Sequence, residues 1–202
     1  MPSHSAKSLF EQNIQSARDC LALFDGIEKL KPANVNLDWI LRAGVVFAVS
    51  AIDTYFHDKV RYRVGRYSLA NLPPALARFE VEIAELTVWD EATRKGNVLR
   101  NWVVDHLSAR PLQSRKAITD ALRLAGIQAV WDTIEPDQKK RDVFLREFDS
   151  LIRRRNQISH EGDRMTSRRS GKKLRQIGRD EVQKWIEYSI ELVSRVEVAF
   201  PS

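Results

Sequence analysis

The chain has 202 residues, of which 43% are hydrophobic and 30% charged, and its net charge is +6 at pH 7. This balance is typical of a globular domain, so we expect one domain over residues 1–202 without a low-complexity region. The positive charge favours a polyanionic partner, either a nucleic acid or an anionic surface. The single cysteine, Cys20, excludes an internal disulfide and argues against a zinc site, which needs more soft ligands.

The N-terminal segment becomes polar at once and lacks the pattern of a signal peptide, so we expect a cytoplasmic protein. The most apolar stretch, residues 43–56, is shorter than the roughly 20 residues that a membrane span needs, and Asp53 interrupts it. We interpret this stretch as a central core helix without membrane contact. Cys20 follows the apolar pattern of the first helix, which favours a small buried side chain over a catalytic thiol.

Helical spacing of apolar residues runs through most of the chain, whereas strand patterning is nearly absent. Asn36 is placed to cap a second helix that continues to about Tyr62 and is apolar around most of its surface, so this helix should be central. Pro73 and Pro74 suit the first turn of a third helix, and shorter pieces follow up to residue 130. The predicted inward stripes are Phe10, Ile14, Ala17, Leu21 and Phe24; Ile40, Phe47, Ile52 and Phe56; and Leu76, Phe79, Ile83 and Leu86.

Two long helices should close the chain. Asp137 is a good N-cap for the first of them, and Gly162 is a natural stop just past His160. The last helix should start near Asp180, with Gln183 placed for a capping-box-like contact. The predicted buried stripes are Phe144, Phe148 and Leu151, then Val182, Ile186, Ser189, Val193 and Val196. We therefore expect an all-α bundle, with the short helices of residues 75–130 inserted between its long ones.

Polar residues interrupt the buried stripe of the Asp137 helix near its end. Arg155 takes the position where the pattern calls for a core residue, which indicates a polar site or an interface. Asn156 and His160 are four residues apart and share a helix face, whereas Arg155 and His160 diverge by about 140°. One helix should therefore not focus both groups easily. Two copies meeting around a two-fold axis would build a shared cleft.

These residue types suit the cleavage of an RNA phosphodiester. The ribose 2′-OH needs a base, the leaving 5′-oxygen needs an acid, and the phosphorane between them needs positive charge. His160 can serve the first two roles, and the helix C-terminus favours its imidazolium form. Arg155 can bind the phosphate bidentately. The chemistry requires no metal ion or cofactor, and the segment HEGDR at 160–164 lacks the second histidine of a HExxH zinc site.

The segment RNQISH, Arg155 to His160, matches the R-x4-6-H motif of HEPN domains. It ends a long helix late in the chain and is followed by a loop and one more helix, as in that family. The earlier segment SAIDTYFHDKV, residues 50–60, resembles a HEPN helix with a small residue, an acidic residue and then aromatic residues. Together the segments resemble the RiboL-PSP branch, and the likeness in helical layout covers about residues 37–198.

The resemblance implies a helical bundle that dimerises with its two motif helices facing each other. It implies metal-independent RNA cleavage that leaves a 2′,3′-cyclic phosphate, and many such proteins are toxins or antiphage effectors. Carried over by position, Arg155 and His160 are the catalytic pair, and Asn156 orients the substrate or the histidine. Asp53 takes the acidic position of the earlier helix, where it would anchor Arg155 or His160.

Structural roles remain open for each of these residues. Arg155 and His160 could be a helix-end cap and a surface charge, and Asp53 could pair only with a core arginine. His57 lies four residues after Asp53 on the same helix face, either as a second acid–base group or as a partly exposed histidine.

Residues 164–179 hold seven basic residues and no acidic one. They could clamp an RNA backbone beside the motif or form a solvated loop. A second basic group at the end of the Asp53 helix would extend the same surface: Lys59, Arg61, Arg63 and Arg66. The candidate RNA-binding residues are Arg154, Arg164, Arg168, Arg169, Lys172, Lys173 and Arg175.

The leading hypothesis is thus a homodimeric endoribonuclease that acts as a toxin or defence effector on RNA. The alternative is a non-catalytic helical module that binds RNA or a partner protein. A third hypothesis is a subunit neutralised by an antitoxin that binds the motif cleft.

Overall fold

The computed structural model describes residues 5–31, 33, 35–165 and 173–201. Over these residues all regular elements are helical, apart from one isolated antiparallel bridge between Arg164 and Leu174. The prediction of an all-α bundle is confirmed. The elements are α1 (Ala6–Glu28), α2 (Asp38–Val64), two 3-10 turns (Leu69–Asn71 and Leu76–Arg78), α3 (Glu85–Glu91), α4 (Lys95–Ser108), α5 (Arg115–Leu124), α6 (Val130–Ile134), α7 (Gln138–Glu161) and α8 (Arg179–Ala199).

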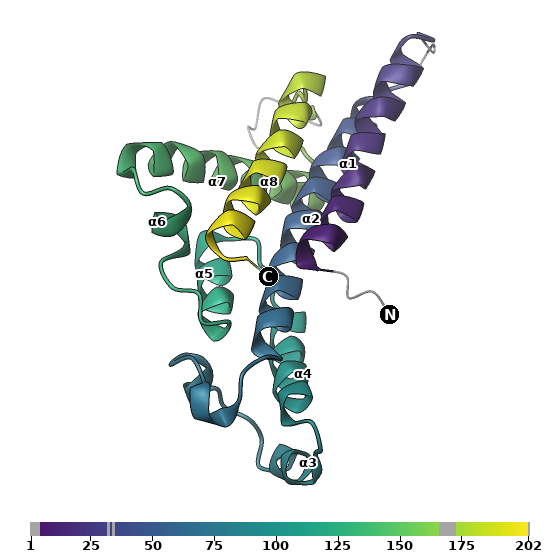
Figure 1. Ribbon diagram of the computed structural model, residues 1–202. Helices are drawn as coiled ribbons and strands as arrows, with labels where there is room; N and C mark the ends of the chain where they lie inside the picture. Colours follow the sequence, from purple (N-terminus) through teal and green to yellow (C-terminus); the bar gives the residue numbers. More distant parts are fainter. Residues whose placement is uncertain (1–4, 32, 34, 166–172, 202) are drawn as a thin grey trace.

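The long helices form the body of the molecule. Helices α1 and α2 make an antiparallel hairpin, α8 runs along it, and α7 crosses α2 behind α8 (Figure 1). Gly44 permits close packing of these helices, since a Cβ atom there would lie 3.2 Å from Val182 Cγ1 and 3.5 Å from Cys20 Cβ. Helix α2 contacts α1, α4, α5, α7 and α8, which confirms its predicted central place.

Helix α2 is also the one helix in the described part of the chain that is long and apolar enough to cross a membrane. Within its most apolar window, however, 56% of the residues are buried inside the bundle. The core helix of a soluble protein has this combination of apolar composition and burial.

The predicted apolar stripes of α1, α7 and α8 are all buried, so the helical spacing located these core faces correctly. Two predicted helix starts differ in detail. Asn36 does accept a hydrogen bond from the Asp38 N–H at 2.9 Å, but the N-cap position itself is Leu37. Helix α8 has no capping box, because its N-cap is Gly178 and Gln183 instead bonds Arg179 and Glu187.

The prediction of one continuous third helix is wrong. After Pro73 and Pro74 the chain makes a short 3-10 turn, becomes extended at Phe79 and forms only the seven-residue α3. Ile83 is 85% exposed, and Leu86 is exposed as well, because no helix of the body covers this outlying segment (Figure 1). Phe47 is likewise exposed on α2 rather than buried. The prediction of short helices inserted before α7 is confirmed.

The buried face of α7 should carry much of the stability. We expect Phe148→Ala to lower the free energy of unfolding by about 3–5 kcal/mol, because Phe148 is fully buried and packs beside Trp131. Val143→Ala on the same helix is the control, since Val143 is 59% exposed and its truncation should change stability by less than about 0.5 kcal/mol. Urea unfolding followed by circular dichroism would measure both, and equal effects would contradict the assignment of the core face.

Candidate active site at the end of helix α7

Helix α7 begins and ends at the residues that the sequence predicted. The Asp137 side chain accepts a hydrogen bond from the Lys140 N–H at 2.9 Å, which caps the first turn. At the other end Gly162 has a φ of 59°, in the left-handed region that glycine adopts without strain, and its N–H bonds the Gln157 carbonyl. The RNQISH segment therefore forms the last turns of α7, and His160 lies directly before the turn.

The structure brings Arg155, Asn156 and His160 together within one chain. Arg155 Nη1 lies 3.2 Å from Asn156 Oδ1 and 3.4 Å from His160 Nε2. Asn156 and His160 are exposed, while Arg155 is half-buried. The expectation that one copy would not focus Arg155 and His160 is thus wrong, because the long arginine side chain spans the angle between the two positions.

A hydrogen bond between Arg155 and His160 can form in one direction only. A guanidinium group can only donate hydrogen bonds, so Nε2 must be the unprotonated nitrogen when it accepts from Nη1. An unprotonated Nε2 is the form of histidine that can take a proton from a hydroxyl group. Arg155 also has a buried Nε without a hydrogen-bond partner among the described residues. An unsatisfied buried donor is rare in stable cores and is more common at functional sites.

Asp53 lies apart from this group. Its Oδ1 accepts a hydrogen bond from the Leu112 N–H at 2.5 Å and lies 3.8 Å from His57 Nε2. Neither Arg155 nor His160 is a partner of its carboxylate among the described residues, in contrast to the prediction that Asp53 anchors one of them. The carboxylate instead ties the loop before α5 to the centre of α2.

A buried cluster of charged residues supports the end of α7, and the sequence reasoning missed most of it. Asp163 is 1% exposed and accepts hydrogen bonds from two arginines. Arg42 of α2 donates through Nε at 2.6 Å, and Arg154 donates through Nη1 and Nη2. Arg154 was predicted to bind RNA, but it is only 7% exposed and its guanidinium is already paired. The signal that sequence reasoning could have used is Arg42, a charged residue within an apolar helix.

The same cluster holds the base of the segment that was predicted as basic, residues 164–179, which we call the basic loop. Arg42 Nη2 donates to the Arg175 carbonyl at 2.8 Å, and Arg154 Nη2 donates to the Gln176 carbonyl at 3.0 Å. The Arg175 N–H in turn donates to the Asp163 carbonyl at 2.8 Å. The two chain segments that enter and leave the loop are therefore fixed against α2 and α7, and the entering segment is held at Asp163, three residues after His160.

The predicted RNA-binding residues differ in how available they are. Arg164 and Lys173 are exposed and form no ion pair with a described residue, whereas Arg175 pairs with Glu161 at 3.2 Å. Lys59, from the second basic group, is buried against Glu197 at 2.7 Å, and its burial lowers its pKa despite that partner. It is therefore not part of an RNA-binding surface. Arg168, Arg169 and Lys172 lie outside the described residues.

Within the described ranges, no group of three or more His, Cys, Asp or Glu side chains is arranged to hold a metal ion. Metal independence stays a prediction from the chemistry of the residues. So do the catalytic roles of Arg155, Asn156 and His160.

A family model described as RiboL-PSP-HEPN matches residues 11–200. The chain belongs to the RiboL-PSP-HEPN family. This match confirms the resemblance seen in the two sequence segments and extends it over almost the whole chain. No match was found among curated proteins or among solved structures. HEPN membership supports a nuclease or RNA-related function at the coarse level, and the R-x4-H segment lies at the exposed helix end described above.

Asp163 should be a large contributor to stability. We expect Asp163→Asn to lower the free energy of unfolding by about 3–5 kcal/mol, because it removes the counter-charge of buried Arg154 and leaves buried Arg42 with only the part-exposed Asp38, 3.6 Å away. Asparagine tolerates the φ of 57° at this position, so the backbone is not the cause of the loss. Asp142→Asn, at an exposed position on α7, is the matched control and should change stability by less than about 0.5 kcal/mol.

Urea unfolding would measure both variants. Hydrogen exchange at Met165 and Arg175 would report on the loop base, because their amides donate across it. Unchanged exchange at these amides in Asp163→Asn would contradict the role of the cluster in holding the loop.

Proposed function

We propose that this RiboL-PSP-HEPN protein is a metal-independent endoribonuclease whose catalytic group is Arg155, Asn156 and His160. The observation that carries the proposal is the 3.4 Å contact between Arg155 Nη1 and His160 Nε2 at an exposed helix end. This contact puts a base and a fixed positive charge within reach of one phosphate. Family membership supports the choice of RNA as the substrate.

The chemistry follows from these groups. When Arg155 turns its Nη1 donor to the phosphate, the lone pair of His160 Nε2 is released and takes the proton of the ribose 2′-OH, and the 2′-oxygen attacks the adjacent phosphorus. The bond from phosphorus to the 5′-oxygen breaks, and the proton passes from the imidazolium to that oxygen. The products are a 2′,3′-cyclic phosphate and a 5′-hydroxyl. Arg155 stabilises the negative charge of the phosphorane, and its neighbour Asn156 holds the guanidinium through Oδ1 at 3.2 Å.

Exposed basic residues beside the motif would bind the RNA backbone. Arg164 and Lys173 lie at the base of the loop that follows His160, and their side chains carry no ion pair within the described part of the chain. We expect their contribution to be independent of base sequence and to fall as salt rises.

We further propose that the protein is cytoplasmic and acts as a homodimer, as a toxin or an antiphage effector. A partner such as an antitoxin would then inhibit it by covering the exposed end of α7. A non-catalytic module that binds RNA or protein is the competing function. RNA cleavage in the absence of divalent metal separates the two.

The cleavage experiment compares three proteins in buffer with EDTA. We expect the wild type to cut single-stranded RNA to 2′,3′-cyclic ends, and His160→Ala to cut it about 10²–10⁴-fold more slowly through loss of the acid–base group. His57→Ala is the matched histidine control, because His57 contacts Asp53 rather than the motif, and its rate should equal that of the wild type. RNA binding without cleavage by the wild type would favour the non-catalytic module.

Mixing two inactive variants tests how the dimer builds its site. Because Arg155 and His160 of one chain already contact each other, we expect Arg155→Ala mixed with His160→Ala to remain inactive. A site built from the arginine of one copy and the histidine of the other would instead regain activity in mixed dimers. Light scattering on the same samples measures the oligomeric state, and a monomer at micromolar concentration would remove the dimer from the proposal.

A further inference from the structure

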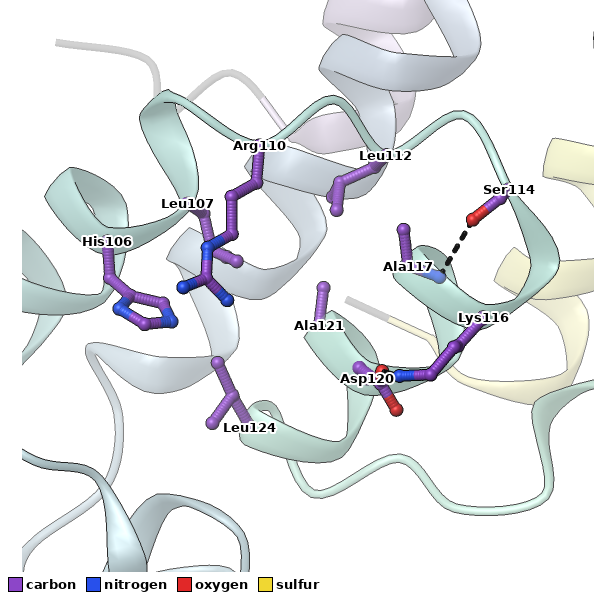
Figure 2. Close-up of a pocket in the computed structure, with 10 residues that line it drawn as sticks. All are labelled: His106, Leu107, Arg110, Leu112, Ser114, Lys116, Ala117, Asp120, Ala121 and Leu124. Carbon is purple, nitrogen blue, oxygen red and sulfur yellow. Dashed lines mark hydrogen bonds and ion pairs between the residues drawn. The ribbon is translucent and has the colours of Figure 1, made fainter.

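Two hollows on the surface meet at Ser114, the N-cap residue of α5. One lies between the end of α4 and the side of α5 (Figure 2). The other lies between the loop before α5 and α7, where Gln113 and Ser114 face Arg153, Asn156 and Gln157. Because Asn156 contacts Arg155, the second hollow starts at the candidate active site. The two hollows share Ser114 in their lining, so they lie next to each other between the candidate catalytic group and the inserted helices, and we call them together the path.

Positive charge predominates along this path, because its carboxylates already have partners. Asp149 pairs with Arg115, Glu161 pairs with Arg175 and Asp120 pairs with Lys116. By contrast, neither Arg153 in the second hollow nor Arg110 in the first forms an ion pair with a described residue. Two uncompensated guanidinium groups thus lie along the path, one in each hollow.

The first hollow combines a cation with an apolar floor. In Figure 2 the guanidinium of Arg110 points into it between the ring of His106 and Ala121 and above Leu124, and Leu107 also lines the hollow. His106 itself packs edge-on against Phe79, with ring centroids 5.0 Å apart. Partial burial, and then the charge of Arg110, lowers the pKa of His106, so the imidazole is neutral at pH 7. Arg110 therefore supplies the positive charge in this hollow, and His106 does not.

These features match a nucleotide of single-stranded RNA. Single-stranded nucleic acid is bound by cations that follow the phosphates and by apolar or aromatic side chains that take the bases. A neutral imidazole beside an apolar floor offers a base both a hydrogen-bonding group and a contact surface.

The path also lies on the other side of α7 from the basic loop. The loop base contacts α2 at Arg42, whereas the loop before α5 contacts α2 at Asp53. These positions are 11 residues apart, or about 16 Å along the helix. An RNA strand that crosses the end of α7 would therefore contact the basic loop on one side of this helix and enter the path at Asn156 on the other side.

We propose that an RNA strand bound at Arg155 and His160 continues past Ser114 into the hollow between α4 and α5, where Arg110 binds a phosphate. This inference rests on the proposed function and assigns the inserted helices to substrate binding. RNA long enough to fill both hollows binds through Arg110, and RNA that reaches only the catalytic group does not.

The test measures binding separately from cleavage. Every protein carries His160→Ala, so that RNA stays intact, and fluorescence anisotropy follows a labelled unstructured 12-nucleotide RNA, roughly the length that fills such a path. A 4-nucleotide RNA is measured by competition. We expect Arg110→Ala to weaken binding of the longer RNA about tenfold and to lower the salt dependence by about one phosphate contact, with the shorter RNA unaffected. Arg110→Lys should restore most of the affinity.

Arg18→Ala is the matched control, because Arg18 is an exposed arginine on α1 without an ion pair among the described residues. Its binding should equal that of the parent. The proposal is overturned if Arg110→Ala leaves the longer RNA unaffected, if it weakens both RNAs equally, or if Arg18→Ala has the same effect. Selective weakening, in a protein whose wild type cuts no RNA, would support the strand path and refute the ribonuclease. If the wild type cuts RNA but Arg110→Ala does not change binding, the ribonuclease is supported and the strand path is refuted.

Discussion

The structure of the motif region depends on one buried carboxylate between two arginines. Asp163 bonds Arg42 from α2 and Arg154 from α7, and it lies immediately beyond the glycine that ends α7. Two guanidinium groups and one carboxylate leave an excess positive charge in the interior, which is costly without further partners. Asp38, 3.6 Å from Arg42 Nη1, and the carbonyls of Arg175 and Gln176 supply them, so the returning segment of the loop is part of the same bonded unit.

This constraint fixes the helix end that carries the proposed catalytic group. Helix α7 crosses α2, with the Asp163 cluster on one side of the crossing and the Asp53 contact to Leu112 on the other. His160 and Asn156 are exposed at this end of α7, while Arg155 is half-buried. Catalysis by fixed charges requires such preorganised groups, because a mobile arginine would lose the benefit of its position.

Much of the fold was predictable from sequence because helix periodicity and capping are local. Asp137, Gly162 and the stripe from Phe144 to Leu151 defined α7 to within a residue. The wrong predictions concern features that depend on contacts between distant parts of the chain. Ile83 and Leu86 follow helical spacing, yet no body helix lies above them to bury them. The 140° angle between Arg155 and His160 holds for an ideal helix, but the reach of the arginine side chain outweighs it.

The sequence by itself determined the helical class, the position of the motif at the end of α7 and the family to which the chain belongs. Only the tertiary structure decided which of the two neighbouring arginines is buried in an ion pair and which one can contact a substrate. The sequence pattern put Arg155 at the core position and Arg154 among the RNA-binding residues, but Arg154 is the buried one and bonds Asp163, while Arg155 contacts Asn156 and His160. The reason is distance along the chain. Arg42 and Asp163 are 121 residues apart, so no local pattern reports that they meet.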